Sequence, residues 1–263
     1  MDDIQTSPIF TNGLEIMEHA IEHLKTKSPR DMRLAVLHAD NALELLLKEL
    51  ARIKGIRLID KKGHPISYYA CVDKLEEKGI KIPGLPDIDI LHDERNAIYH
   101  LGSQPDEKKT EWLVYKVALN LFSRICLDEF KYDITTFSKE FSLSSDIEHE
   151  IEVTDSEITN RYQKDALKTF SDGKFNASVV FSYMAIEVFL REKIPLDLRQ
   201  GPRQLQGLIE DDLISDEEMR EIVSLRNSRN LTVHGGYSPT RDEAKVAIEI
   251  SRKIIGIIDS VCK

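Results

Sequence analysis

The chain has 263 residues, which is enough for one large domain or two domains of ordinary size. A hydrophobic fraction of 41%, with 31% charged and 7% aromatic residues, supports packed cores and is typical of a soluble, helix-rich protein. The net charge of -10 argues against a general nucleic-acid coating protein, although it leaves room for a local basic cleft.

Hydrophobic periodicity predicts five helices in the first half of the chain, at 12–27, 30–53, 67–78, 87–101 and 105–132. Asn12 is the expected cap of the first helix, and Ser28-Pro29 separates it from the second. A small β-hairpin could form between the second and third helices. His19 and His23 lie four residues apart and could in principle hold a metal, but the acidic residues around them favour a solvated face.

Serine and threonine become frequent after the fifth helix, where the helical periodicity fades. The second half then predicts helices at 155–171, 176–193, 204–212, 216–234 and 240–261. We therefore predict an all-α fold of two tandem helical bundles, residues 1–133 and 153–263, with a linker over 134–152.

Three cysteines lie far apart and form neither a disulfide framework nor a CxxC metal motif. We expect reduced thiols, as in a cytoplasmic protein. No apolar run approaches the ~20 residues that a membrane span needs, and no signal peptide is visible. We accordingly expect no membrane partner.

The two halves share landmarks in the same order, which indicates an internal repeat. The segment Ala42–Glu49 aligns with Ala185–Glu192 at an offset of 143 residues. Glu44 and Glu187 occupy equivalent places in these segments. A catalytic role is conceivable for both, but i, i+4 ion pairs with Lys48 and Arg191 are favoured.

A second pair of landmarks is the sequence Arg-Asn-x-x-x-His followed by glycine, at 95–100 and 229–234. An Arg-x4-His spacing alone occurs by chance, and Arg33…His38 is such a copy, without the asparagine or the glycine. Two full copies at matching places of a repeat are hard to attribute to accident.

This spacing favours phosphodiester chemistry. On a helix, Asn and His at i and i+4 share one face, and the long Arg side chain can reach them. The glycines predict that each helix ends just after its histidine, where the helix dipole favours the protonated imidazole. Arg can then hold a phosphate with its forked donors while His exchanges a proton, and a metal is not required. The alternative is that Arg and His cap a helix end and pair with acids of the next helix.

The motifs Arg95-Asn96…His100 and Arg229-Asn230…His234 resemble the signature of the HEPN (higher eukaryotes and prokaryotes nucleotide-binding) family. That signature is Arg and His separated by four to six residues, with a polar residue after the Arg. The resemblance implies an all-α bundle. In many members it also implies metal-independent, cofactor-free endoribonuclease activity in defence, toxin–antitoxin or RNA-processing systems.

Family sites are usually composite, with two signatures facing each other across a dimer interface, so a chain with two signatures resembles a fused dimer. A true homodimer is the alternative. The resemblance implies that His100 and His234 act as base and acid, and that Arg95 and Arg229 stabilise the phosphate. Asn96, Asn230 and Arg226 would bind substrate.

RNA is the expected substrate, and a neutralising or regulatory protein is a possible partner. The toxin branch carries tyrosine two residues after the histidine, where this chain has Gly102 and Gly236. The acidic balance leaves a non-catalytic module that binds RNA, a nucleotide or a protein as the alternative function.

Overall fold

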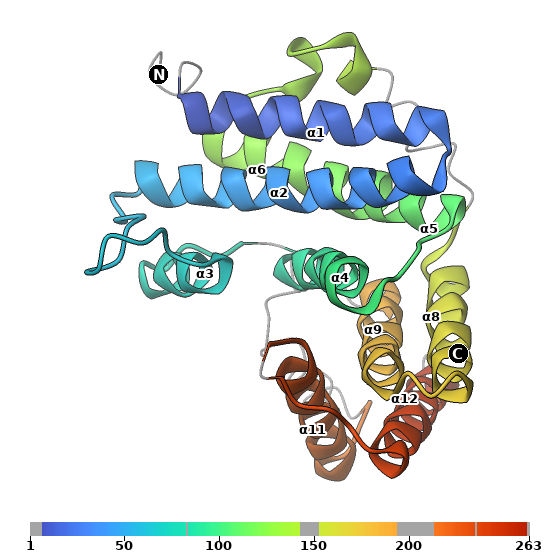
Figure 1. Ribbon diagram of the computed structural model, residues 1–263. Coiled ribbons are helices and arrows are strands. Elements are labelled where there is room, and N and C mark those ends of the chain that lie inside the picture. The colour runs from blue at the N-terminus through green and yellow to red at the C-terminus, as the bar shows by residue number, and fades with distance from the viewer. Residues whose placement is uncertain (1–6, 83, 143–152, 194–212, 235, 262–263) are drawn as a thin grey trace. The chain divides into compact units, whose positions relative to one another are not determined.

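The computed structural model describes residues 7–82, 84–142, 153–193, 213–234 and 236–261 (Figure 1). These residues are mostly helical and form no sheet, which confirms the all-α prediction. The helices are α1 (Pro8–Thr26), α2 (Pro29–Ile53), α3 (Tyr68–Glu77), α4 (Leu85–Asn96), η1 (Ala97–Leu101), α5 (Glu107–Glu111), η2 (Trp112–Leu119), α6 (Asn120–Phe130), η3 (Ile134–Thr136), α8 (Asp155–Ser171), α9 (Phe175–Lys193), α11 (Asp216–His234) and α12 (Arg241–Val261). The helix predicted at 204–212 lies outside the described residues.

The chain divides into two compact units. One contains residues 1–82 and 104–152, and the other contains residues 83–103 and 153–263. This grouping differs from a division by sequence order, because the segment 83–103, with the first Arg-Asn-x-x-x-His motif, clusters with the C-terminal half.

In the unit formed by 1–82 and 104–152, α1 and α2 run side by side (Figure 1). The start of α1 differs from the prediction, because it is Ser7 and Pro8 that open the helix rather than Asn12. Proline suits the first helical position, since its missing N–H would have no partner there. Ser28 caps α2 by accepting a hydrogen bond from the Asp31 backbone N–H at 3.1 Å.

The predicted hairpin after α2 is reduced to one antiparallel bridge between Ile59 and Pro65. Helices α5, η2 and α6 form one continuous helical run over 107–130, which matches the long helix predicted there. Its middle, η2, has the wider π-helical bonding and is apolar and largely buried. Past it, Ile134 and Phe141 are buried, so this part of the expected linker is packed.

Three histidines gather between α1 and α2. The His23 ring lies 5.0 Å from the His38 ring and the His19 ring lies 6.1 Å from it. The Nδ1 of His23 is also 3.0 Å from Asp31 Oδ1, so His23 does not sit on a freely solvated face. Burial, followed by the charges of His23 and His19, lowers the pKa of His38 from its ordinary 6.5.

This lowered pKa predicts an acid-sensitive unit. The folded state binds a proton at His38 less readily than the unfolded chain does, so stability is lost as the pH falls below about 6.5. Trp112, the single tryptophan, lies in the same unit and reports its melting temperature by fluorescence. Between about pH 7.5 and pH 5.5, the melting temperature of wild type should fall more than that of His38→Leu. An equal decrease in the melting temperature of both proteins would contradict the role of His38 in this acid sensitivity.

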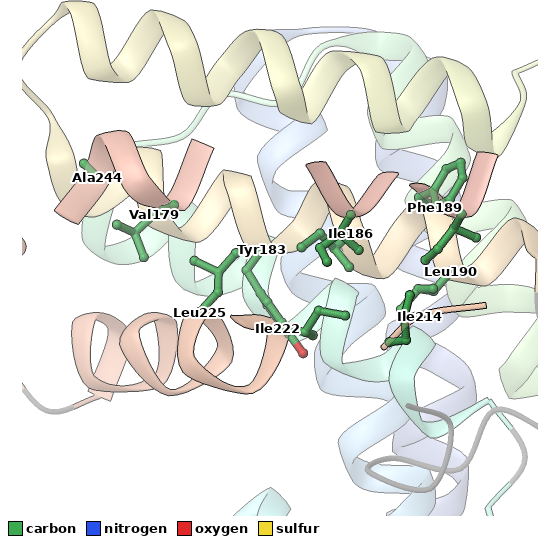
Figure 2. Packing of buried hydrophobic residues seen from close by; sticks show 12 residues of the cluster. Val179, Tyr183, Ile186, Phe189, Leu190, Ile214, Ile222, Leu225 and Ala244 are labelled. Atoms are coloured by element: carbon green, nitrogen blue, oxygen red, sulfur yellow. The ribbon is translucent and has the colours of Figure 1, made fainter. Parts of the chain in front are cut away.

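The other unit is built on the pair α8 and α9, with α11 and α12 packed against α9. Thr154 and Glu157 form a capping box at the start of α8, which begins and ends as predicted. Figure 2 shows its core, where side chains of α9 meet those of α11 and α12; the cluster is Val179, Tyr183, Ile186, Phe189, Leu190, Ile214, Ile222, Leu225, Ala244, Ala247, Ile254 and Ile258. This core fixes α11, which carries the second motif.

Candidate functional site

The two motifs lie in the same compact unit, formed by residues 83–103 and 153–263. The first begins at the end of α4 and continues through η1, and the second occupies the last six residues of α11. Each helix ends where the glycines predict: η1 ends at Leu101 and α11 at His234. Gly102 and Gly236 both take the left-handed conformation with φ of 67°, which a side chain would strain.

The closure of the two helix ends is also the same. The backbone N–H of Ser103 donates to the carbonyl of Ala97 at 3.0 Å, and that of Tyr237 donates to the carbonyl of Leu231 at 3.2 Å. Both bonds reach back over six residues, at equivalent positions of the two motifs. The repeated sequence therefore produces the same closure of the helix end after each histidine, although η1 is a π-helix and α11 is an α-helix.

Within each motif the asparagine accepts a hydrogen bond from the arginine before it. Arg95 Nη1 donates to Asn96 Oδ1 at 2.8 Å, and Arg229 Nη1 donates to Asn230 Oδ1. Asn96 is buried and Asn230 is partly buried. The amides thus orient the arginines, a role that the sequence did not assign to them.

Arg229 also forms an ion pair with Asp93, and this pair joins the helices that carry the two motifs. Both partners are buried: the Arg229 side chain is 5% exposed and that of Asp93 is 0% exposed. The guanidinium lies 5.9 Å from the centre of the Tyr183 ring. Arg229 is therefore enclosed by its own protein, with its terminal nitrogens on a carboxylate and an amide.

Arg95 has a different environment. It is partly buried, and its guanidinium carbon lies 5.1 Å from the centre of the Tyr99 ring, a cation–π distance. Tyr99 is 59% exposed and His100 is also exposed, with their ring centres 6.5 Å apart. The first motif therefore presents a cation, an aromatic ring and an imidazole on the surface.

Arg226, the further residue predicted to contact substrate, lies among acids. Burial raises the pKa of Asp89, against the opposing effect of Arg229 and Arg226. Burial also raises the pKa of Glu187 well above its usual value, Asp89 raises it further, and Arg226 opposes both effects. Burial, with Glu187 close by, raises the pKa of Tyr183 as well. Arg226 thus interacts with carboxylates of its own unit.

Further polar contacts hold the segment 83–103 in this unit. Arg191 Nη1 lies 2.7 Å from Asp155, and its Nε lies 3.4 Å from Asp87. The hydroxyl of Tyr162 donates to Glu94 Oε2 at 3.0 Å. These contacts of the acids of α4 were not predicted from the sequence. The one sequence feature that points to them is the high density of acidic residues between Asp87 and Glu94.

Glu44 forms the predicted ion pair with Lys48, at 2.5 Å. Its counterpart Glu187 lies beside Tyr183 and Asp89, and its predicted partner Arg191 contacts Asp155 and Asp87. The side chain of His234 lies outside the part of the chain that the structure describes, whereas its backbone ends α11. In the part of the chain that the structure describes, no group of three or more His, Cys, Asp or Glu side chains could hold a metal ion.

No described helix is long and apolar enough to cross a membrane.

A comparison with protein families matches residues 156–261 to the family described as HEPN domain. The match covers α8, α9, α11 and α12, including the second motif, whereas the segment 83–103 lies outside it. No curated protein and no solved structure matches the chain.

Proposed function

We propose that the protein is a metal-independent endoribonuclease, from the premise that residues 156–261 match the HEPN domain family, which suggests a nuclease or RNA-binding function. One observation carries the proposal. Two Arg-Asn-x-x-x-His motifs lie in one compact unit, end in the same backbone closure, and are joined by the Asp93–Arg229 ion pair.

The reaction begins with attack of a ribose 2′-OH on the adjacent phosphorus. One of His100 and His234 removes the 2′-OH proton, and the other donates a proton to the leaving 5′-oxygen. The P–O2′ bond forms as the P–O5′ bond breaks, which yields a 2′,3′-cyclic phosphate and a 5′-OH. Arg95 stabilises the charge on the phosphate oxygens, because it is partly exposed and its guanidinium lies next to the ring of Tyr99, the residue before His100.

In this proposal the two motifs form one composite site within the chain, as a pseudo-dimer of two HEPN-like bundles would. A role in defence, as a regulated toxin or in RNA processing fits this activity, with a neutralising protein as the partner. We place the protein in the cytoplasm, where three unpatterned cysteines stay reduced.

The test is incubation of purified protein with tRNA and with an unstructured RNA in the presence of EDTA. Wild type should cleave, and its products should carry 5′-OH ends that polynucleotide kinase labels without prior phosphatase. His100→Ala and His234→Ala should each lower the cleavage rate by about 10²–10⁴-fold, the usual contribution of a general acid or base. His64→Ala, at an exposed loop histidine of the other unit, is the matched control.

Cleavage that survives in the His100→Ala/His234→Ala double variant would discredit the assigned site. RNA binding without cleavage by wild type would favour the second candidate, a non-catalytic binding module. Two observations favour this non-catalytic module: the net charge of -10 and the burial of Arg229.

A further inference from the structure

Tyr99 is the largest apolar side chain that the motif surfaces expose. At 59% it has the highest exposed fraction of the large hydrophobic residues described in the chain. It directly precedes His100 in η1, and the two ring centres are 6.5 Å apart. A single exposed aromatic residue is ordinary on a protein surface. The position of Tyr99 next to the proposed catalytic imidazole of His100 indicates a function for this ring.

The ring is held in place while it stays open to solvent. The guanidinium carbon of Arg95 lies 5.1 Å from its centre, and Arg95 is itself fixed by its hydrogen bond to Asn96. The ring therefore has a cation on one side and a large accessible area elsewhere. An aromatic ring already placed in this way loses little conformational freedom when a ligand stacks on it.

The second motif has no such ring. The residue equivalent to Tyr99 is Val233, which is partly buried, and the exposed apolar residue there is Leu231. The two motifs therefore share the closure of their helix ends but differ in the side chain next to the histidine. This difference gives the first motif a contact that its repeat lacks.

We propose that Tyr99 is a stacking site for an unpaired nucleobase of the RNA whose phosphate is cleaved beside His100. This inference rests on the proposed function and names its substrate class: single-stranded RNA, with weak sequence preference. Every base has a π-face, so stacking on an aromatic side chain is tolerant of sequence, whereas a paired base inside a helix cannot reach the ring. Arg95 beneath the ring strengthens the stack and contacts the backbone phosphate.

The experiment compares wild type with Tyr99→Ala, Tyr99→Phe and Tyr99→Trp. The first readout is the dissociation constant for a fluorescent 2′-O-methyl oligouridine, which cannot be cleaved; the second is kcat and KM on oligouridine RNA. Tyr69→Ala is the control, because Tyr69 is 37% exposed and lies in the other unit. Far-UV circular dichroism checks that every variant is folded.

Tyr99→Ala should weaken binding and raise KM by about 5- to 140-fold, the loss expected for one stacked base, with a smaller change in kcat. Tyr99→Phe and Tyr99→Trp should behave as wild type, because they keep the aromatic face. Annealing the RNA to its complement should remove the difference between wild type and Tyr99→Ala.

Two results would overturn the inference alone: Tyr99→Ala that binds and cleaves as wild type does, or Tyr99→Phe that loses as much as Tyr99→Ala. The latter would assign the effect to the hydroxyl group. Wild type that neither binds nor cleaves any RNA would instead overturn the proposed function, and the stacking site with it.

Discussion

Replacing Asp93 with alanine is expected to lower the free energy of unfolding by about 3–5 kcal/mol. The substitution leaves the buried guanidinium of Arg229 without its carboxylate, and the desolvated charge then has no compensation. The neighbouring Asp89 is a weaker counter-charge than Asp93, because burial raises the pKa of Asp89 and so favours its neutral form. The measurement is urea-induced unfolding followed by far-UV circular dichroism.

The control removes an exposed ion pair from the same unit. Glu249 lies 3.8 Å from Lys245, both side chains are mostly exposed, and Glu249→Ala should change the stability little. The double variant Asp93→Leu/Arg229→Met replaces both buried charges with apolar groups. It should be more stable than Asp93→Ala, because neither charge is then left unpaired. If Asp93→Ala were as mild as Glu249→Ala, the ion pair would not join the two motif helices.

Local signals in the sequence were sufficient for most helix boundaries. The glycines after His234 predicted the end of α11. The capping box of Thr154 and Glu157, which begins α8, is a local signal of the same kind. Signals of this kind act within a few residues of a helix end, so they can be read without a fold. The predicted start of α1 at Asn12 was wrong. Asn12 and Ser7 are both good N-cap residues, but the proline that follows Ser7 favours the first helical position.

The surroundings of the motif arginines could not be predicted in the same way. Charged residues are almost always exposed unless they are paired, so the sequence alone does not mark the acids of α4 as buried partners of arginines. Their partners Arg191 and Arg229 are roughly a hundred residues or more away in sequence, and only the packing of 83–103 with 153–263 brings them together. The two motifs are therefore alike in sequence, but tertiary contacts make the surroundings of their arginines unequal.

That inequality predicts different effects for the two arginines on cleavage. Arg95→Ala should lower the rate constant of a single turnover by about 10²–10³-fold, the usual loss when one donor to a developing oxyanion is removed. Its melting temperature should stay closer to that of wild type than the melting temperature of Arg229→Ala does, because Arg95 is partly exposed whereas Arg229 is buried. Arg229→Ala should instead lower the melting temperature, since it leaves Asp93 buried and uncompensated.

The Asp93→Leu/Arg229→Met variant separates the two roles of Arg229. It removes the cation while it spares the fold the penalty of an unpaired buried charge. If Arg229 acts by holding the motif helices together, the single-turnover rate constant of the folded variant should lie closer to wild type than to Arg95→Ala. A folded double variant as inactive as Arg95→Ala would mean that Arg229 leaves Asp93 during the reaction and contacts the phosphate, which would make the two motifs equivalent in catalysis.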